Sequence, residues 1–301
     1  SFFNNRLSGS FDYFVRYTYD MIGPAPELSS LLGTSVPKIN NSDMKSYGFE
    51  LEVNWRDRIG EVSYGAKFVL SDDQQKILRY PNDSYDVGSY YKGEHLNDIW
   101  GLTTIGIAKS QEEMDAHLAK VDQSSVGTNW GVGDIMYADL DGDGKISNGT
   151  NKLGDTGDYR IIGNSTPRFK YGITLDAAWK GFDFSMTWSG ATKVSRLLDD
   201  IFREPFGATD SRSLMKYMID DMWTPEKGNS AKAPAISFTN KVNNYRDSDL
   251  WLRDASYLRL KNVEIGYNFP KKILSKINIG SLRVFATGYN LLTLDKLKIV
   301  D

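Results

Sequence analysis

Acidic side chains alternate in the stretch YADLDGDGKISNG, residues 137–149. This spacing matches the front half of an EF-hand-type loop, in which oxygens at alternate positions converge on one hard cation and a glycine at the sixth position permits the sharp turn. Gly144 stands at that sixth position. The spacing predicts a calcium site with these ligands: Asp139, Asp141, Asp143, the backbone carbonyl of Lys145, and Ser147.

The second half of the loop departs from that pattern. Thr150 occupies the twelfth position, where a bidentate carboxylate is wanted, and the nearest substitute is Asp155. The preceding residues GVGDIMYA favour an extended chain over an entering helix. Two interpretations stay open: a calcium loop completed by Asp155, or a turn-rich Asp-Gly loop that holds no ion.

Aromatic residues are frequent in the longest segment between predicted strands. Flat rings there could stack on the faces of sugar rings, and packing within the loop is the alternative. The candidate substrate contacts are Tyr90, Tyr91, Trp100 and Trp130.

The sequence gives little support for a catalytic site. His95 and His117 are the two histidines, and neither belongs to a metal-ligand motif. The sequence has no G-x-S-x-G, P-loop or H-E-x-x-H motif and no cysteine, which excludes a thiol nucleophile and a Cys-zinc site. We therefore expect a protein that is not an enzyme.

The composition of the chain further narrows the class of protein to which it can belong. The 301 residues carry a net charge of −3, which offers nothing to attract nucleic acid. The sequence contains no run of eighteen apolar residues, so it predicts no transmembrane helix. No signal peptide is visible at its start. The chain begins without methionine and ends abruptly, so we expect a piece of a longer protein.

The elements that must position these residues are strands, because hydrophobicity alternates with a period of two. In residues 47–55, Tyr47, Phe49, Leu51, Val53 and Trp55 share one face, while Glu50, Glu52 and Asn54 lie on the other. Comparable patterns occur at residues 11–19, 62–70, 169–179, 182–189 and 263–269, and less cleanly at 282–292.

Short and long connections alternate between these strands. Residues 180–181 leave room only for a tight hairpin turn, whereas residues 20–45, 71–167 and 191–256 form long loops. Such alternation is typical of transmembrane β-barrels, which place short turns at one membrane face and long loops at the other. The pattern predicts an all-β fold: an antiparallel meander that forms part of a large transmembrane barrel, with short helices in the outer loops.

Several runs resemble the SusC/RagA-type TonB-dependent outer-membrane transporters. They include GDIMYADLDGDGKI, GDYRIIGNSTPRFKYGITLDAAWKGFDFSMTWSG and WLRDASYLRLKNVEIGYNFPKKIL. LRVFATGYNLLTL and MWTPEKGNSAKAPAI resemble that family too, and the matches span nearly the whole chain in order. The resemblance implies that the Asp-Gly stretch belongs to an outer loop.

The resemblance also implies the wider context. In that family a barrel of about 22 strands is plugged by an N-terminal domain. A SusD-like surface lipoprotein caps the barrel, and the TonB complex drives import of oligosaccharides or peptides. Residues 1–301 would then be the C-terminal portion of the barrel in a Gram-negative outer membrane, lacking the plug domain and the last strand. The alternative is a soluble carbohydrate-binding β-sandwich with a calcium loop.

Overall fold

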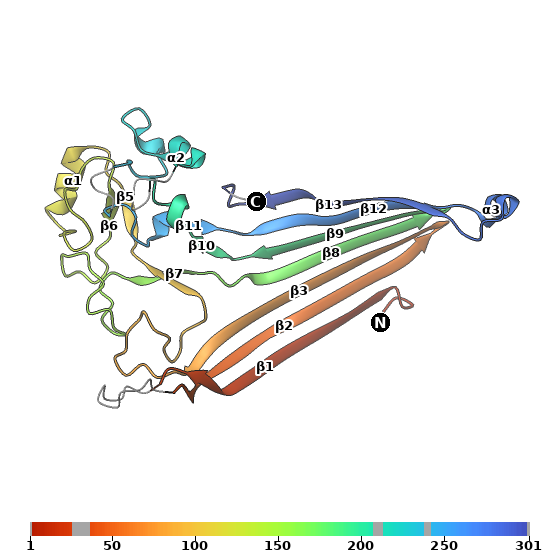
Figure 1. Ribbon diagram of the computed structural model, residues 1–301, viewed down its shortest axis with the longest axis horizontal. Helices are drawn as coiled ribbons and strands as arrows, with labels where there is room; N and C mark the ends of the chain where they lie inside the picture. The colour runs from red at the N-terminus through yellow and green to blue at the C-terminus, as the bar shows by residue number, and fades with distance from the viewer. Residues whose placement is uncertain (1, 26–36, 207–212, 238–241, 300–301) are drawn as a thin grey trace.

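The computed structural model describes residues 2–25, 37–206, 213–237 and 242–299. Seven long strands run side by side, and a body of loops, short strands and short helices lies at one end of them (Figure 1). The long strands are β1 (Leu7–Gly23), β2 (Ile39–Ile59), β3 (Val62–Arg79), β8 (Arg168–Trp179), β9 (Phe182–Thr192), β12 (Tyr257–Asn268) and β13 (Arg283–Asp295).

The shorter elements belong mostly to the loops. The short strands are β4 (Asp98–Gly101), β5 (Thr104–Ile107), β6 (Ile135–Tyr137), β7 (Arg160–Asn164), β10 (Ser195–Leu197) and β11 (Leu252–Asp254). The α-helices are α1 (Gln111–Leu118), α2 (Lys216–Asp221) and α3 (Lys271–Leu274). Within the described residues, single turns of 3-10 helix span Asp200–Phe202, Gly228–Ser230, Asp249–Trp251 and Ser275–Ile277.

The seven long strands form one antiparallel sheet in the order β1-β2-β3-β8-β9-β12-β13. Each long strand pairs with the next long strand along the chain, so the predicted meander is confirmed. The sheet does not close on itself, because β1 and β13 are its edges. It is an open part of a barrel wall.

Two tight turns set the register at one end of the sheet. Gly60 and Glu61 connect β2 to β3. Lys180 and Gly181 connect β8 to β9, as the sequence predicts. Lys180 and Gly181 have φ of 45° and 91°, the left-handed values that a two-residue hairpin turn matched to strand twist requires.

The register separates an apolar face from a polar face across the sheet. Opposite residues of paired strands point to the same side, and Leu51 pairs with both Phe11 and Leu70. In a neighbouring row on the same face, Phe68 pairs with Ile173, and Ile173 pairs with Trp188. Phe11 is 64% exposed on the edge strand. A continuous apolar face of this kind fits a surface that meets lipid.

The other face carries charged and hydroxyl side chains. Lys67 forms a salt bridge of 2.7 Å with Glu52, and Arg283 contacts Asp183 and, at 2.6 Å, Glu264. This polar face fits the lumenal side of a barrel, where polar side chains meet water or a plug.

The strands extend further than the sequence analysis expected. β2 already begins at Ile39 and β3 continues to Arg79, into the segments 20–45 and 71–167 that were expected to be loops. The sequence pattern does not predict this extension, because residues 71–76 are all polar. The alternation of apolar and polar residues therefore stops before β3 ends. Residues 26–36, 207–212 and 238–241 of the expected loops lie outside the described residues.

The loop body has hydrophobic clusters of its own. One contains Leu102, Ile135, Tyr137 and Ile146, all fully buried, and another is centred on Trp251. Ser110 caps the N-terminus of α1, where its side chain accepts a hydrogen bond from the Glu113 amide. In the described part of the chain, no helix is long and apolar enough to cross a bilayer.

Placing a charge on the apolar face tests its contact with lipid. We expect Val53→Arg to destabilise the full-length protein in lipid by about 2–4 kcal/mol if Val53 lies near the bilayer midplane. The matched control is Ser10→Arg, because Ser10 pairs with Glu52 at the same height on the polar face. Denaturant unfolding in lipid vesicles measures both variants, and equal stabilities would contradict the assignment of faces.

Candidate functional site

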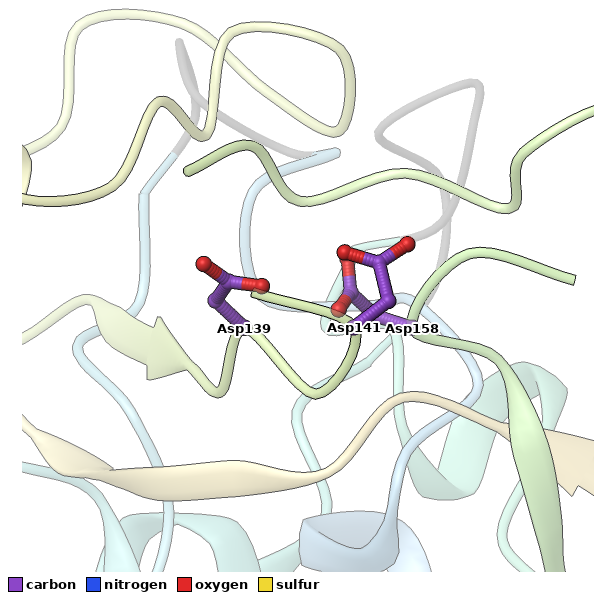
Figure 2. Close-up of side chains that lie close together, drawn as sticks. All are labelled: Asp139, Asp141 and Asp158. Atoms are coloured by element: carbon purple, nitrogen blue, oxygen red, sulfur yellow. The ribbon is translucent and has the colours of Figure 1, made fainter. Parts of the chain in front are cut away.

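Three carboxylates converge in the loop body beyond β6. Asp139 and Asp141 come from the predicted calcium-type loop, and Asp158 comes from the segment that leads into β7 (Figure 2). One carboxylate oxygen of each lies within 4.8 Å of the others. Asp158 is fully buried, while Asp141 is exposed.

The loop holds its shape through hydrogen bonds from backbone amides to side chains. Asp139 accepts hydrogen bonds from the Gly142 amide at 2.7 Å and from the Gly144 amide at 2.9 Å. Gly142 and Gly144 have φ of 79° and 80°, a left-handed conformation that glycine adopts without penalty. The alternation of aspartate and glycine therefore wraps the chain around the first carboxylate.

Asp158 joins the two ends of this loop. Its Oδ1 accepts a hydrogen bond from the Leu140 amide at 2.6 Å, and its Oδ2 accepts one from the Ser147 amide at 2.9 Å. Its own amide donates to the Ser147 carbonyl at 2.7 Å. Sequence reasoning missed this residue because the twelve-position loop pattern ends at Thr150, well before Asp158.

The other predicted ligands make local contacts instead. The Asp143 carboxylate accepts a hydrogen bond from the Lys145 amide at 2.7 Å, and the Ser147 hydroxyl accepts one from the Gly149 amide at 3.1 Å. Asp155 accepts a hydrogen bond of 2.6 Å from the Thr150 hydroxyl. Of the predicted ligands, the structure thus brings Asp139 and Asp141 together with a carboxylate that was not predicted.

The donor set fits a hard divalent cation. Among the described residues, none of the three clustered carboxylates forms a salt bridge with a lysine or an arginine. Calcium takes six to eight oxygen ligands, so the three carboxylates would need carbonyl or water oxygens to complete the shell. The chemistry available here is binding, without a nucleophile or a proton carrier in the group.

The predicted aromatic contacts separate into two places. Tyr90 is 46% exposed and packs edge-on against Tyr80 at 5.4 Å between ring centroids. Tyr91 is half-buried, and burial together with Glu94 and Asp98 raises the pKa of its hydroxyl. Trp100 lies on β4. Trp130 instead packs edge-on against buried Tyr137 and contacts two of the hydrophobic clusters.

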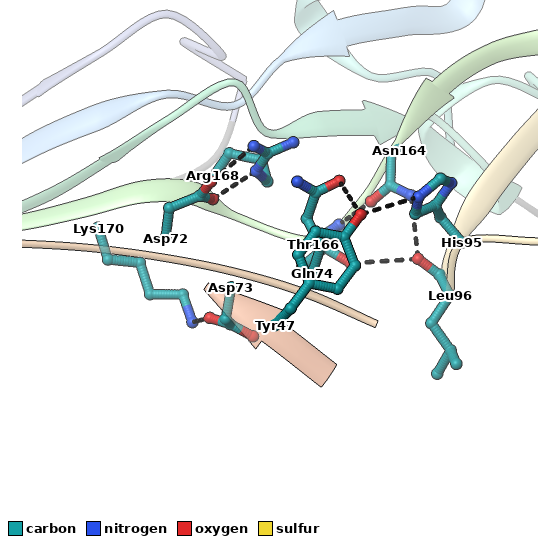
Figure 3. A network of polar contacts seen from close by, with 10 residues as sticks. All are labelled: Tyr47, Asp72, Asp73, Gln74, His95, Leu96, Asn164, Thr166, Arg168 and Lys170. Carbon is teal, nitrogen blue, oxygen red and sulfur yellow. Dashed lines mark hydrogen bonds and ion pairs between the residues drawn. The ribbon is translucent and has the colours of Figure 1, made fainter. Parts of the chain in front are cut away.

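A polar pocket of about 150 Å³ lies where β3 and β8 meet the loop body. Arg168 on β8 forms a two-pronged ion pair with Asp72 on β3, and the Tyr47 hydroxyl lies 3.4 Å from His95 Nε2 and 3.5 Å from Gln74 Oε1 (Figure 3). The pocket is lined by Gln74, Gln75, His95, Leu96, Asp98, Asn164, Thr166 and Arg168.

Comparisons with known proteins agree on one family. "TonB-dependent receptor P3" of Formosa agariphila is 28% identical over 97% of this chain, and "TonB-dependent receptor SusC" of Bacteroides thetaiotaomicron is 22% identical over all of it. The resemblance to SusC/RagA-type TonB-dependent receptors is confirmed. No family model matches the chain. The chain spans 28% of the length of each of these two relatives.

Solved structures show the same fold. The RagAB peptide importer in its "open-open" state matches with a TM-score of 0.68 and 21% identity, and in its "closed-closed" state with a TM-score of 0.64 and 23% identity. Both matches cover 97% of this chain and 30% of the other. The sheet of this chain is therefore a segment of a large transmembrane β-barrel, as the sequence predicts.

Removing the Asp158 charge tests how the loop is held. We expect Asp158→Asn to speed exchange of the Leu140 and Ser147 amide hydrogens by roughly tenfold to a hundredfold, because a hydrogen bond to a charged acceptor contributes about 1.5–3 kcal/mol. Hydrogen–deuterium exchange of the full-length protein measures this. Asp155→Asn is the control, because the Asp155 carboxylate accepts its hydrogen bonds from the amide and hydroxyl of Thr150 within the same turn. Equal exchange in both variants would show that Asp158 does not hold the loop.

Proposed function

We propose that this chain forms the C-terminal portion of the barrel of a TonB-dependent importer in the outer membrane of a Gram-negative bacterium. The observation that carries the proposal is the seven-stranded meander with one apolar and one polar face, whose long connections assemble at one end. The names of the relatives and the fold of the RagAB importer support it.

The proposed cargo is a nutrient of the oligosaccharide or peptide class. The RagAB structures are described as those of a peptide importer. We propose that a SusD-like lipoprotein covers the loop body and that the TonB complex acts through parts of the protein beyond this chain. Tyr90, Tyr91 and Trp100 are proposed to contact cargo, and Tyr90 is the most accessible of them.

The alternative, a soluble carbohydrate-binding sandwich, requires two sheets packed face to face with apolar residues between them. The seven long strands instead form a single sheet, and its apolar row includes Phe11 and Tyr13, which are 64% and 66% exposed. A soluble sandwich would bury such a row in its core, so this alternative is not favoured.

Transport by the intact protein tests the proposal. We expect deletion of the gene for the full-length protein to abolish uptake of one of two cargo classes, labelled oligosaccharides or labelled peptides. Supplying the gene in trans should restore that uptake. A protonophore should block the restored uptake, because TonB-driven import needs the proton gradient. Unchanged uptake of both cargo classes in the deletion strain would refute an import function.

We also propose that the loop binds one calcium ion through Asp139, Asp141 and Asp158. Three neighbouring carboxylates that form no salt bridge with a lysine or arginine among the described residues support this. Two of them already accept two backbone hydrogen bonds each, which weakens them as donors to a metal. The ion would brace the loop and do no chemistry.

Calorimetry tests for the ion. We expect calcium to bind the purified full-length protein with a dissociation constant of about 0.1–1 mM, as in extracellular modules. Asp141→Asn should abolish the binding heat, since Asp141 is the exposed member of the group, whereas Asp143→Asn should preserve it. Absence of heat at millimolar calcium, with the same melting temperature in chelator, would leave an Asp-Gly turn without metal.

A further inference from the structure

Two lysines stand directly opposite each other near the outer end of the apolar face. Lys45 on β2 pairs with Lys76 on β3, and Tyr17 on β1 pairs with Lys45 from the other side. Like charges directly opposite each other on paired strands repel and destabilise the pairing. Among the described residues, neither lysine forms a salt bridge.

The nearest carboxylates along these strands are already neutralised. Asp43 is bound by Arg79 at 2.7 Å, and Asp72 is bound by Arg168 at 2.6 Å. These two carboxylates therefore do not pair with either lysine. Lys45 Nζ lies 5.1 Å from the ring centroid of Tyr47 and 5.7 Å from that of Tyr17, so aromatic rings hold the ammonium group in place.

The height of the pair along the strand places it at a membrane surface. Tyr47 and Trp55 lie on the apolar face and are separated by eight residue steps. At about 3.3 Å per residue this is roughly 26 Å along the strand, which a tilt of about 35–45° projects to roughly 19–22 Å of the ~25 Å apolar band of a membrane barrel. Lys45 lies two residues beyond Tyr47, which is the level of lipid head groups.

The polar pocket adjoins the pair. The backbone of Lys76 pairs with that of His95, and Gln74 lies two residues before Lys76 on the same face as Tyr47. Amide, imidazole and hydroxyl groups line the pocket together with the Asp98 carboxylate and the Arg168 guanidinium, and these groups can bind the hydroxyl groups of a small polar unit. An anion bound by the lysines could place a hydroxylated neighbour in this pocket.

We propose that Lys45 and Lys76, together with the adjoining pocket, bind the phosphorylated and hydroxyl-rich head group of a lipid in the outer leaflet. A phosphate between the two ammonium groups would remove their repulsion. The pair lies on the face opposite the lumenal salt bridges, which favours a lipid over transported cargo. The proposal rests on the membrane barrel of the proposed function, but lipid binding and nutrient uptake are separate measurements.

Lipid binding by the full-length protein tests the site. The probe is lipid A, a phosphorylated glucosamine lipid, added to detergent-solubilised protein and measured by native mass spectrometry. We expect Lys45→Gln/Lys76→Gln to weaken lipid A binding about thirtyfold, because each lysine beside an anionic lipid surface contributes a factor of about five. Lys45→Arg/Lys76→Arg should retain binding. The matched control is Lys109→Gln/Lys120→Gln, which changes two exposed lysines of the loop body.

Three outcomes would overturn the proposal. One is equal lipid A binding by the glutamine variant and the wild type, and another is an equal loss in the loop-body control. The third is binding of dephosphorylated lipid A, or of inorganic phosphate alone, as tightly as lipid A. Nutrient uptake by the glutamine variant, assayed in the deletion strain, reports on the import function independently of these results.

Discussion

The strand register is the constraint on which the rest of this structure depends. Side chains alternate between the two faces, so a slip of one residue would bring Glu50, Glu52 and Asn54 to the apolar side. Every strand must therefore keep its pairing over its whole length, and tight turns such as that at Lys180 and Gly181 fix the starting point. Because the period is two, one correct turn determines the face of every residue along the hairpin until a bulge intervenes.

The same constraint gathers the loops into one body. The short turns lie at one end of the sheet, so the long connections meet at the other end. There, buried polar groups form hydrogen bonds with residues that are far away in the sequence. The Asp134 carboxylate accepts a hydrogen bond from the Asn244 side-chain amide at 2.7 Å, and the Tyr137 hydroxyl donates to the Asn243 carbonyl at 2.8 Å. Burial raises the pKa of Tyr137, which keeps its hydroxyl a donor.

The sheet was predictable from sequence where one face meets lipid, because the apolar alternation from Tyr47 to Trp55 is unbroken. It was not predictable at Asp72 to Lys76, where both faces are polar and alternation carries no signal, so the extension of β3 was missed. In the calcium-type loop, the local spacing identified Asp139 and Asp141, whose contacts lie within a few residues. Asp158 was missed because its position depends on the fold of the intervening chain.

The loop body and the sheet are built on different principles, and this separation decides which positions can change without loss of the fold. The strands depend on an uninterrupted register and tolerate few changes of polarity. The loop body depends on its own clusters around Tyr137 and Trp251 and on side chains that cap backbone amides, as Asp158 does for Leu140 and Ser147. An exposed residue such as Tyr90 contributes to neither framework. A change of its type therefore leaves the register and the buried caps in place.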